Sequence, residues 1–190
     1  MNDIFVGLIL LFVNFNINLG ASTVGLLPSF VGAYLIWKGA RELSAESETM
    51  RELDMVLKVA IGVHAVIWVC NFFGAVYAWG LLFWLLNVAS QLMNLYILHQ
   101  LTGGVEELEK IRCVDMRVEM LKRWWIAIFA FSVLNVFLGR SFWSVLCTIG
   151  WFVALLGYLL CFRDGGRAYM TAVNDPAVFV GQQEDNEYDA

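Results

Sequence analysis

Positive charge is confined to short segments of this 190-residue chain, and no other feature limits its fold as strongly. Eleven of the twelve Lys and Arg residues fall within three segments, 38–58, 106–123 and 163–167. The stretches 4–37, 59–105 and 124–162 contain one formal charge between them, Arg140. Each stretch exceeds the roughly 20 apolar residues that a helix needs to cross a bilayer. We therefore predict a multi-pass membrane protein.

Each uncharged stretch has room for two helices, so we expect an all-α integral membrane bundle of six transmembrane helices within residues 1–167. The expected spans are approximately 4–19, 23–40, 57–78, 81–101, 124–139 and 142–162. The 60% share of hydrophobic residues fits this class, because soluble domains have about 45–50%. For the first pair, a re-entrant or tilted hairpin is the alternative, since 34 uncharged residues must supply two crossings and a turn.

The side on which the basic residues lie predicts the orientation. Because cytoplasmic loops of membrane proteins are rich in Lys and Arg, we expect both basic connections and both termini in the cytoplasm. Residues 168–190 should form an acidic, mobile tail, since six of the seventeen acids follow Arg163. The chain lacks the basic surface that nucleic-acid binding requires. The expected surroundings are therefore a lipid bilayer and, at its inner face, a membrane or cytoplasmic protein partner.

The second basic segment has the apolar periodicity of an amphipathic helix. Apolar residues recur every three or four positions over 105–122, after Gly103 and Gly104, which we expect to end the preceding helix. This cytoplasmic helix would lie on the membrane surface, bind a partner, or pack against the inner ends of the bundle. If it binds a partner, the expected contact residues are Arg112, Arg117 and Lys122.

A polar stripe follows the fourth expected span. It consists of Asn87, Ser90, Gln91 and Asn94. Their spacing places them on one face of a helix, which is unfavourable against lipid. The stripe either joins helices by hydrogen bonds or lines a hydrated cavity, and in the second case Asn71 and Asn135 are candidate lining residues. It is the best candidate ligand-binding surface in the sequence.

A faint repeat relates the three expected hairpins. An offset of 62 residues aligns Tyr34, Tyr96 and Tyr158, each followed by two aliphatic residues. Such triplets are common in membrane helices, so chance alignment is the competing explanation. A real repeat predicts three helical hairpins related by an axis along the membrane normal.

No pattern in the sequence predicts catalysis. The expected spans hold no carboxylate, and the cysteines, Cys70, Cys113, Cys147 and Cys161, lack metal-binding spacing. His64 and His99 are expected at different depths, which disfavours a shared haem and favours hydrogen-bonded or snorkelling side chains. We therefore predict no enzyme, no metal and no cofactor.

The run from Leu19 to Gly32 contains Leu-Gly followed by Gly-Leu-Leu-Pro-Ser-Phe-Val-Gly. It resembles the N-terminal region of uncharacterised multi-pass membrane proteins of Gram-positive bacteria, which have a similar Leu-Gly … Gly-Leu-Leu-Pro-x-Phe-Val-Gly motif. Ser29 stands where an acid is expected after the proline. The resemblance covers about forty residues, and it implies a bacterial cytoplasmic membrane but no activity.

Two functional hypotheses follow. The first is a non-catalytic accessory or regulatory membrane protein that acts through its cytoplasmic helices, because the charged residues concentrate there. The second is a small carrier or channel with a polar path along the fourth span.

Overall fold

The computed structural model describes residues 1–13, 16–19, 22–25, 28–73, 80–138 and 142–174. Their elements, in chain order, are α1 (Asn2–Phe12), β1 (Asn16–Leu19), β2 (Ser22–Gly25), α2 (Ser29–Leu43), α3 (Glu48–Phe72), α4 (Gly80–Arg112), α5 (Val118–Leu138) and α6 (Phe142–Asn174). The chain divides into two compact units, 1–104 and 105–190, and the division falls within α4. The predicted all-α class is correct apart from one two-stranded hairpin.

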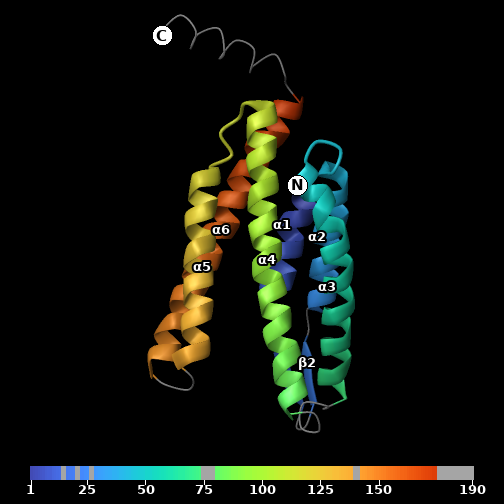
Figure 1. Cartoon of the computed structure of the whole chain (residues 1–190), viewed down its shortest axis with the longest axis vertical. Helices are drawn as coiled ribbons and strands as arrows, with labels where there is room; N and C mark the ends of the chain where they lie inside the picture. Colours follow the sequence, from blue (N-terminus) through green and yellow to red (C-terminus); the bar gives the residue numbers. More distant parts are fainter. Residues whose placement is uncertain (14–15, 20–21, 26–27, 74–79, 139–141, 175–190) are drawn as a thin grey trace, which may run out of the picture. The chain divides into compact units, whose positions relative to one another are not determined.

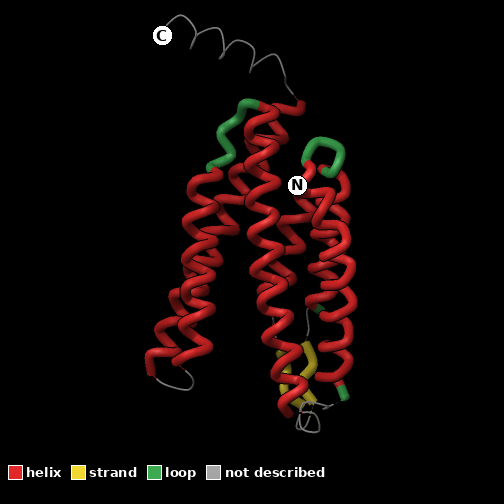
Figure 2. Tube along the Cα trace, in the orientation of Figure 1, coloured by secondary structure: helices red, strands yellow, loops and turns green. Residues whose placement is uncertain are grey.

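The first unit is a helical bundle extended by the β-hairpin. Helix α1 packs on α2, α2 packs on α3, and β2 lies against α3. The strands are antiparallel, with Asn16 opposite Gly25. Within this unit the N-terminus and the connection from α2 to α3 lie at one end, and the β-hairpin lies toward the other (Figure 2).

Glycine allows α1 and α2 to approach closely. A Cβ atom on Gly32 would lie 2.6 Å from the backbone nitrogen of Leu11, and one on Gly7 would lie 2.7 Å from the carbonyl oxygen of Gly32. Such backbone contact is typical of small residues between membrane helices. At the charged end of this pair, Lys38 Nζ lies 2.8 Å from Asp3 Oδ2.

The second unit is an antiparallel pair, α5 and α6, together with the last turns of α4 (Figure 1). Aromatic rings fill the positions that its glycines leave open: a Cβ atom on Gly157 would lie 2.5 Å from the Trp124 ring, and one on Gly150 would lie 2.6 Å from the Phe131 ring. Gly150 and Gly157 therefore give the side chains of α5 room to approach α6.

Three helices among the described residues are long and apolar enough to cross a membrane, not the six that we predicted. These are α3, α4 and α6, in each of which an 18-residue segment has a mean hydropathy of 1.9, 1.6 and 2.3, respectively. Helices α1 and α2 have 11 and 15 residues, hence lengths of about 17 and 23 Å, which are less than the roughly 30 Å hydrocarbon core. Helix α5 is not among the three, and its first six residues include Glu119, Lys122 and Arg123.

The predicted spans 4–19 and 23–40 are wrong because strands interrupt them. The sequence contained the signal: Asn14, Asn16 and Asn18 alternate with Phe15, Ile17 and Leu19, which is the two-residue period of a strand. Gly20 follows this alternation, and Ser22, Thr23 and Val24 include two β-branched residues, which favour strands. The high apolar content of the segment concealed its period.

The predicted amphipathic helix 105–122 is also wrong as a single element. Helix α4 continues through Gly103 and Gly104 to Arg112, and α5 begins at Val118. A Cβ atom on Gly104 would lie 2.5 Å from Met50 Cε, so this glycine gives α3 room to approach α4 instead of ending the helix. Similarly, α6 reaches Asn174, so the first seven residues of the predicted tail 168–190 are helical; residues 175–190 lie outside the described part.

The 62-residue repeat finds partial support. The bounds of α6 lie 62 residues after those of α4, and both helices have 33 residues. The first hairpin departs from this pattern, because its second helix has 15 residues and strands precede it. Tyr158 is buried whereas Tyr34 and Tyr96 are exposed, so the aligned tyrosines do not share one environment. A repeat of three similar helical hairpins is therefore wrong.

Candidate functional site

A histidine buried in the first unit joins three helices. His64, on α3, is 4% exposed. Its Nε2 lies 3.0 Å from Asn94 Oδ1 on α4, and its Nδ1 lies 3.3 Å from Ser29 Oγ on α2 and 3.5 Å from Ser90 Oγ on α4. The helical spacing of Ser90 and Asn94 aligns both with the same ring.

These partners specify the roles of the ring nitrogens. With the carboxamide oriented so that Oδ1 faces the ring, Nε2 donates its hydrogen to Asn94 and Nδ1 accepts from a serine hydroxyl. Because a hydroxyl also accepts, the cluster can solvate a protonated ring without losing a partner. The prediction of a hydrogen-bonded histidine is confirmed for His64. Both of its nitrogens are occupied, so they are poorly suited to ligating a haem.

The structure splits the predicted polar stripe on α4. Ser90 and Asn94 lie at the histidine, as described above. Asn87 and Gln91 are exposed, and the Asn87 side chain donates to the backbone oxygen of Phe83 in its own helix (2.8 Å). Half of the stripe therefore joins helices by hydrogen bonds, which was one of the two predicted roles.

The two further lining candidates do not join this cluster. Asn71 is half-buried in the last turn of α3. Asn135 belongs to the second unit, where Ser144 Oγ donates to its Oδ1 (2.7 Å) and its Nδ2 donates to Thr148 Oγ1 (3.1 Å). Asn135 thus links α5 to α6.

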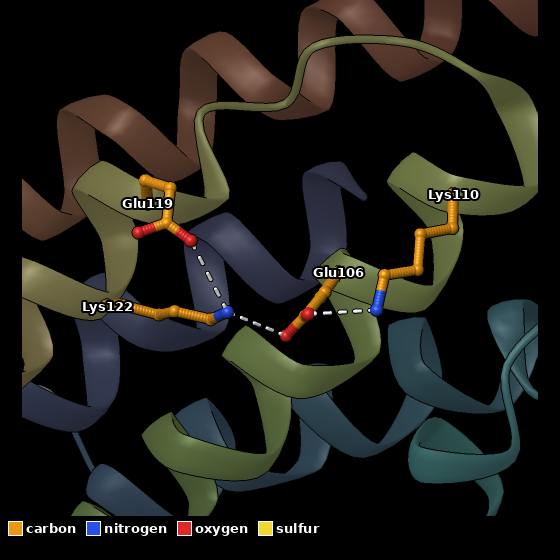
Figure 3. Close-up of polar contacts among 4 residues, drawn as sticks. All are labelled: Glu106, Lys110, Glu119 and Lys122. Atoms are coloured by element: carbon orange, nitrogen blue, oxygen red, sulfur yellow. Dashed lines mark hydrogen bonds and ion pairs between the residues drawn. The ribbon is translucent and has the colours of Figure 1, made fainter.

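A charged cluster, Glu106, Lys110, Glu119 and Lys122, joins the end of α4 to the start of α5 (Figure 3). We call it the α4–α5 clasp. Glu106 forms an ion pair through each of its carboxylate oxygens. Lys110 Nζ lies 2.9 Å from Oε1, and Lys122 Nζ lies 3.0 Å from Oε2. Lys122 also lies 3.6 Å from Glu119. The hydrogen bond to Glu106 raises the pKa of Lys122 above its usual range.

All three predicted partner-binding residues make contacts within the second unit. Besides Lys122 in the clasp, Arg117 Nη1 lies 3.0 Å from Asp164 Oδ2 on α6, and the Arg112 guanidinium lies 6.0 Å from the centroid of the Tyr169 ring. Arg117 has a φ of 59°, and its backbone N–H donates to Asp115 Oδ1 (2.8 Å). These side chains order the connection as well as presenting charge.

Sequence reasoning missed a small pocket at the charged end of the first unit. Its volume is about 210 Å³, and its lining consists of Trp37, Ala40, Arg41, Ser44, Met50, Arg51 and Asp54. It lies where the end of α2 meets the start of α3, a helix capped by Ser47 Oγ, which accepts from the Met50 N–H. The sequence feature that could have predicted this pocket is a tryptophan flanked by basic residues at the end of an expected span.

No group of three or more His, Cys, Asp and Glu side chains that could hold a metal occurs in the described part of the chain. The four cysteines are free thiols, of which Cys161 is buried and Cys113 is exposed. The chain matches no known protein family, no curated protein and no solved structure.

Proposed function

We propose that the chain is a multi-pass protein of a bacterial cytoplasmic membrane, with both termini in the cytoplasm. In this proposal α5 crosses together with α6, and the protein acts without catalysis as an accessory or regulatory component. Its charged helix ends are the interacting surface. The bacterial origin rests on the sequence resemblance alone.

The observation that carries this proposal is the ordered set of charges on the second unit. An ion pair joins Glu106 on α4 to Lys122 on α5, and a second joins Arg117, in the connection between these helices, to Asp164 on α6. All four side chains stay partly exposed. Exposed pairs contribute little to stability, so their arrangement is better suited to recognition than to folding. Complementary charge on a partner would give specificity and fast association.

Isolation of the tagged full-length protein from its native membrane, in a mild detergent, tests this function by mass spectrometry. We expect a stoichiometric protein partner with the wild type. The double variant Arg117→Glu with Asp164→Arg should lose that partner, because it inverts the outward charge pattern while preserving the intramolecular pair. Arg163→Gln, at an exposed arginine on α6, serves as the control and should retain the partner. A chain isolated alone, or a partner that the charge-swapped variant retains, would contradict the proposal.

The His64 cluster favours a second candidate, a small carrier or channel. It supplies a titratable ring among neutral hydrogen-bond partners in an otherwise apolar region, and intramembrane ionisable residues are frequently functional. Flux into liposomes tests this candidate. If α4 lines a path, then Asn87, Gln91 and Asn94 changed together to Leu should abolish flux, and His64→Ala should do the same. The charge-swapped variant should leave it unchanged.

A further inference from the structure

The pocket between α2 and α3 is too small for a typical drug-sized ligand. Sites for such ligands usually enclose about 300–1,000 Å³, and this one encloses about 210 Å³. Its lining combines two guanidinium groups, Arg41 and Arg51, with the Trp37 ring and one carboxylate, Asp54. The volume and the lining suit a compact polar group.

The carboxylate in the pocket is already neutralised. Asp54 Oδ2 lies 2.6 Å from Lys58 Nζ, and Asp54 Oδ1 accepts from Trp37 Nε1 at 2.6 Å. Both oxygens are therefore occupied by donors. Asp54 orients the indole ring and adds no uncompensated negative charge.

The two arginines keep their charge available for a ligand. The Arg41 guanidinium lies over the Trp37 ring, 5.6 Å from its centroid, and within the described ranges no carboxylate forms an ion pair with it. Arg51 pairs with Glu48 at 2.8 Å, but both side chains are about two-thirds exposed, so that pair is weak. The planar fork of a guanidinium matches the oxygens of a phosphate.

The inference about depth rests on the proposed membrane orientation. The uncharged stretch 59–105 begins one residue after Lys58, and tryptophan concentrates at membrane interfaces. The pocket would then lie level with the lipid phosphates of the inner leaflet, whose surface is negative. We propose that the pocket binds the phosphate of an anionic phospholipid head group, with Arg41 and Arg51 as its ligands.

Titration of the purified full-length protein in an uncharged detergent tests this site. The probes are dioctanoyl phosphatidylglycerol, dioctanoyl phosphatidylcholine and inorganic phosphate, and the readouts are Tm and lipid adducts in native mass spectrometry. Phosphatidylglycerol should raise Tm and form a saturable adduct, whereas phosphatidylcholine should do neither. Arg41→Gln and Arg51→Gln should each weaken binding about tenfold, as expected for loss of a charge-assisted hydrogen bond.

Arg163→Gln is the matched control, because it removes an exposed arginine outside the pocket and should bind like the wild type. If a pocket variant is less stable than the wild type, lipid adducts counted far below its unfolding temperature still measure binding by the folded protein. Equal binding of both lipids, or equal loss in the control, would overturn the proposal. If inorganic phosphate binds as well as the lipid does, and its binding needs Arg41 and Arg51, then the ligand is free phosphate and the proposal of a phospholipid ligand is overturned. Since no protein partner takes part, failure here is distinguishable from failure of the accessory function.

Discussion

His64 is the residue whose removal should affect the first unit most selectively. His64→Ala would leave Asn94 and Ser29 without their shared partner, so we expect a loss of about 1–3 kcal/mol in the free energy of unfolding. Reversible unfolding in mixed micelles measures it. His99→Ala, at an exposed position on α4, is the control. An equal loss for both variants would show that the cluster does not stabilise the bundle.

Gly32 tests the close contact between α1 and α2. Gly32→Ala places a Cβ atom against the backbone of Leu11, so overpacking should destabilise the first unit by about 1–3 kcal/mol. Gly62→Ala is the matched control, since nothing lies within 4 Å of its added Cβ and alanine favours a helix. Thermal unfolding of both variants measures the difference. Destabilisation that is the same at both positions would contradict the close packing.

The sequence predicted which residues share one helix face, because that depends on local spacing. It did not predict contacts between residues that are far apart in the chain. The spacing of Ser90 and Asn94 predicted a shared face, but Ser29 and His64 lie 35 residues apart in sequence and only the fold brings them together. Asn87 and Gln91 belong to the same stripe, yet both are exposed. The pocket at Trp37 needed the same tertiary information.

At the scale of elements, the Asp3–Lys38 ion pair joins α1 to α2 and should depend on pH. The hydrogen bond from Lys38 lowers the pKa of Asp3 below its ordinary 3.8. Stability from this pair is therefore present at neutral pH and lost as the pH falls below that value. Asp3→Asn should lower Tm slightly at pH 7, and its Tm should converge with that of the wild type in acid. A Tm difference that is constant from pH 7 to pH 3 would contradict this role of the carboxylate.

The α4–α5 clasp should restrain the connection 113–117. Glu106→Gln removes the partner of two lysines, and because the pairs are partly exposed we expect amide exchange in the connection to accelerate only about two- to fivefold. Hydrogen exchange with mass spectrometry measures it, and high salt should mimic the variant. Glu119→Gln is the control, since Glu119 lies farther from Lys122. If this variant accelerated exchange as much, Glu106 would not be the centre of the clasp.

Neither charge nor glycine predicted the element boundaries well. The third span was expected from residue 57, whereas α3 begins at Glu48, and the expected helix 105–122 ran across the connection between Arg112 and Val118. Gly103 and Gly104 were expected to end a helix, but α4 runs through both of them. At Gly104, the Met50 side chain of α3 occupies the space that a larger side chain would fill. The alternation over 14–19 was a strand signal that total hydrophobicity outweighed. In a short apolar segment of this kind, the spacing of the polar residues therefore predicts the secondary structure better than the total hydrophobicity does.

Across the whole molecule, long apolar stretches alternate with short charged segments. This distribution of charge was the sequence feature that best predicted membrane-spanning helices. Helices α3, α4 and α6 have the length and composition for crossing. The first hairpin combines short helices with strands, whose unpaired edges are unfavourable in lipid. We therefore expect protein or water, and not lipid, beside the β-hairpin.

Labelling of cysteines from either side of the membrane tests the central claim that α4 crosses the bilayer with its charged end in the cytoplasm. One variant keeps Cys113 alone, which is exposed just beyond α4; the other has Gly80→Cys alone, at the opposite end, where an added side chain meets nothing. With a membrane-impermeant maleimide, we predict that Cys113 is labelled only in inverted vesicles and the cysteine at position 80 only in intact cells. Labelling of both from one side would contradict the crossing, and the reverse pattern would contradict the orientation.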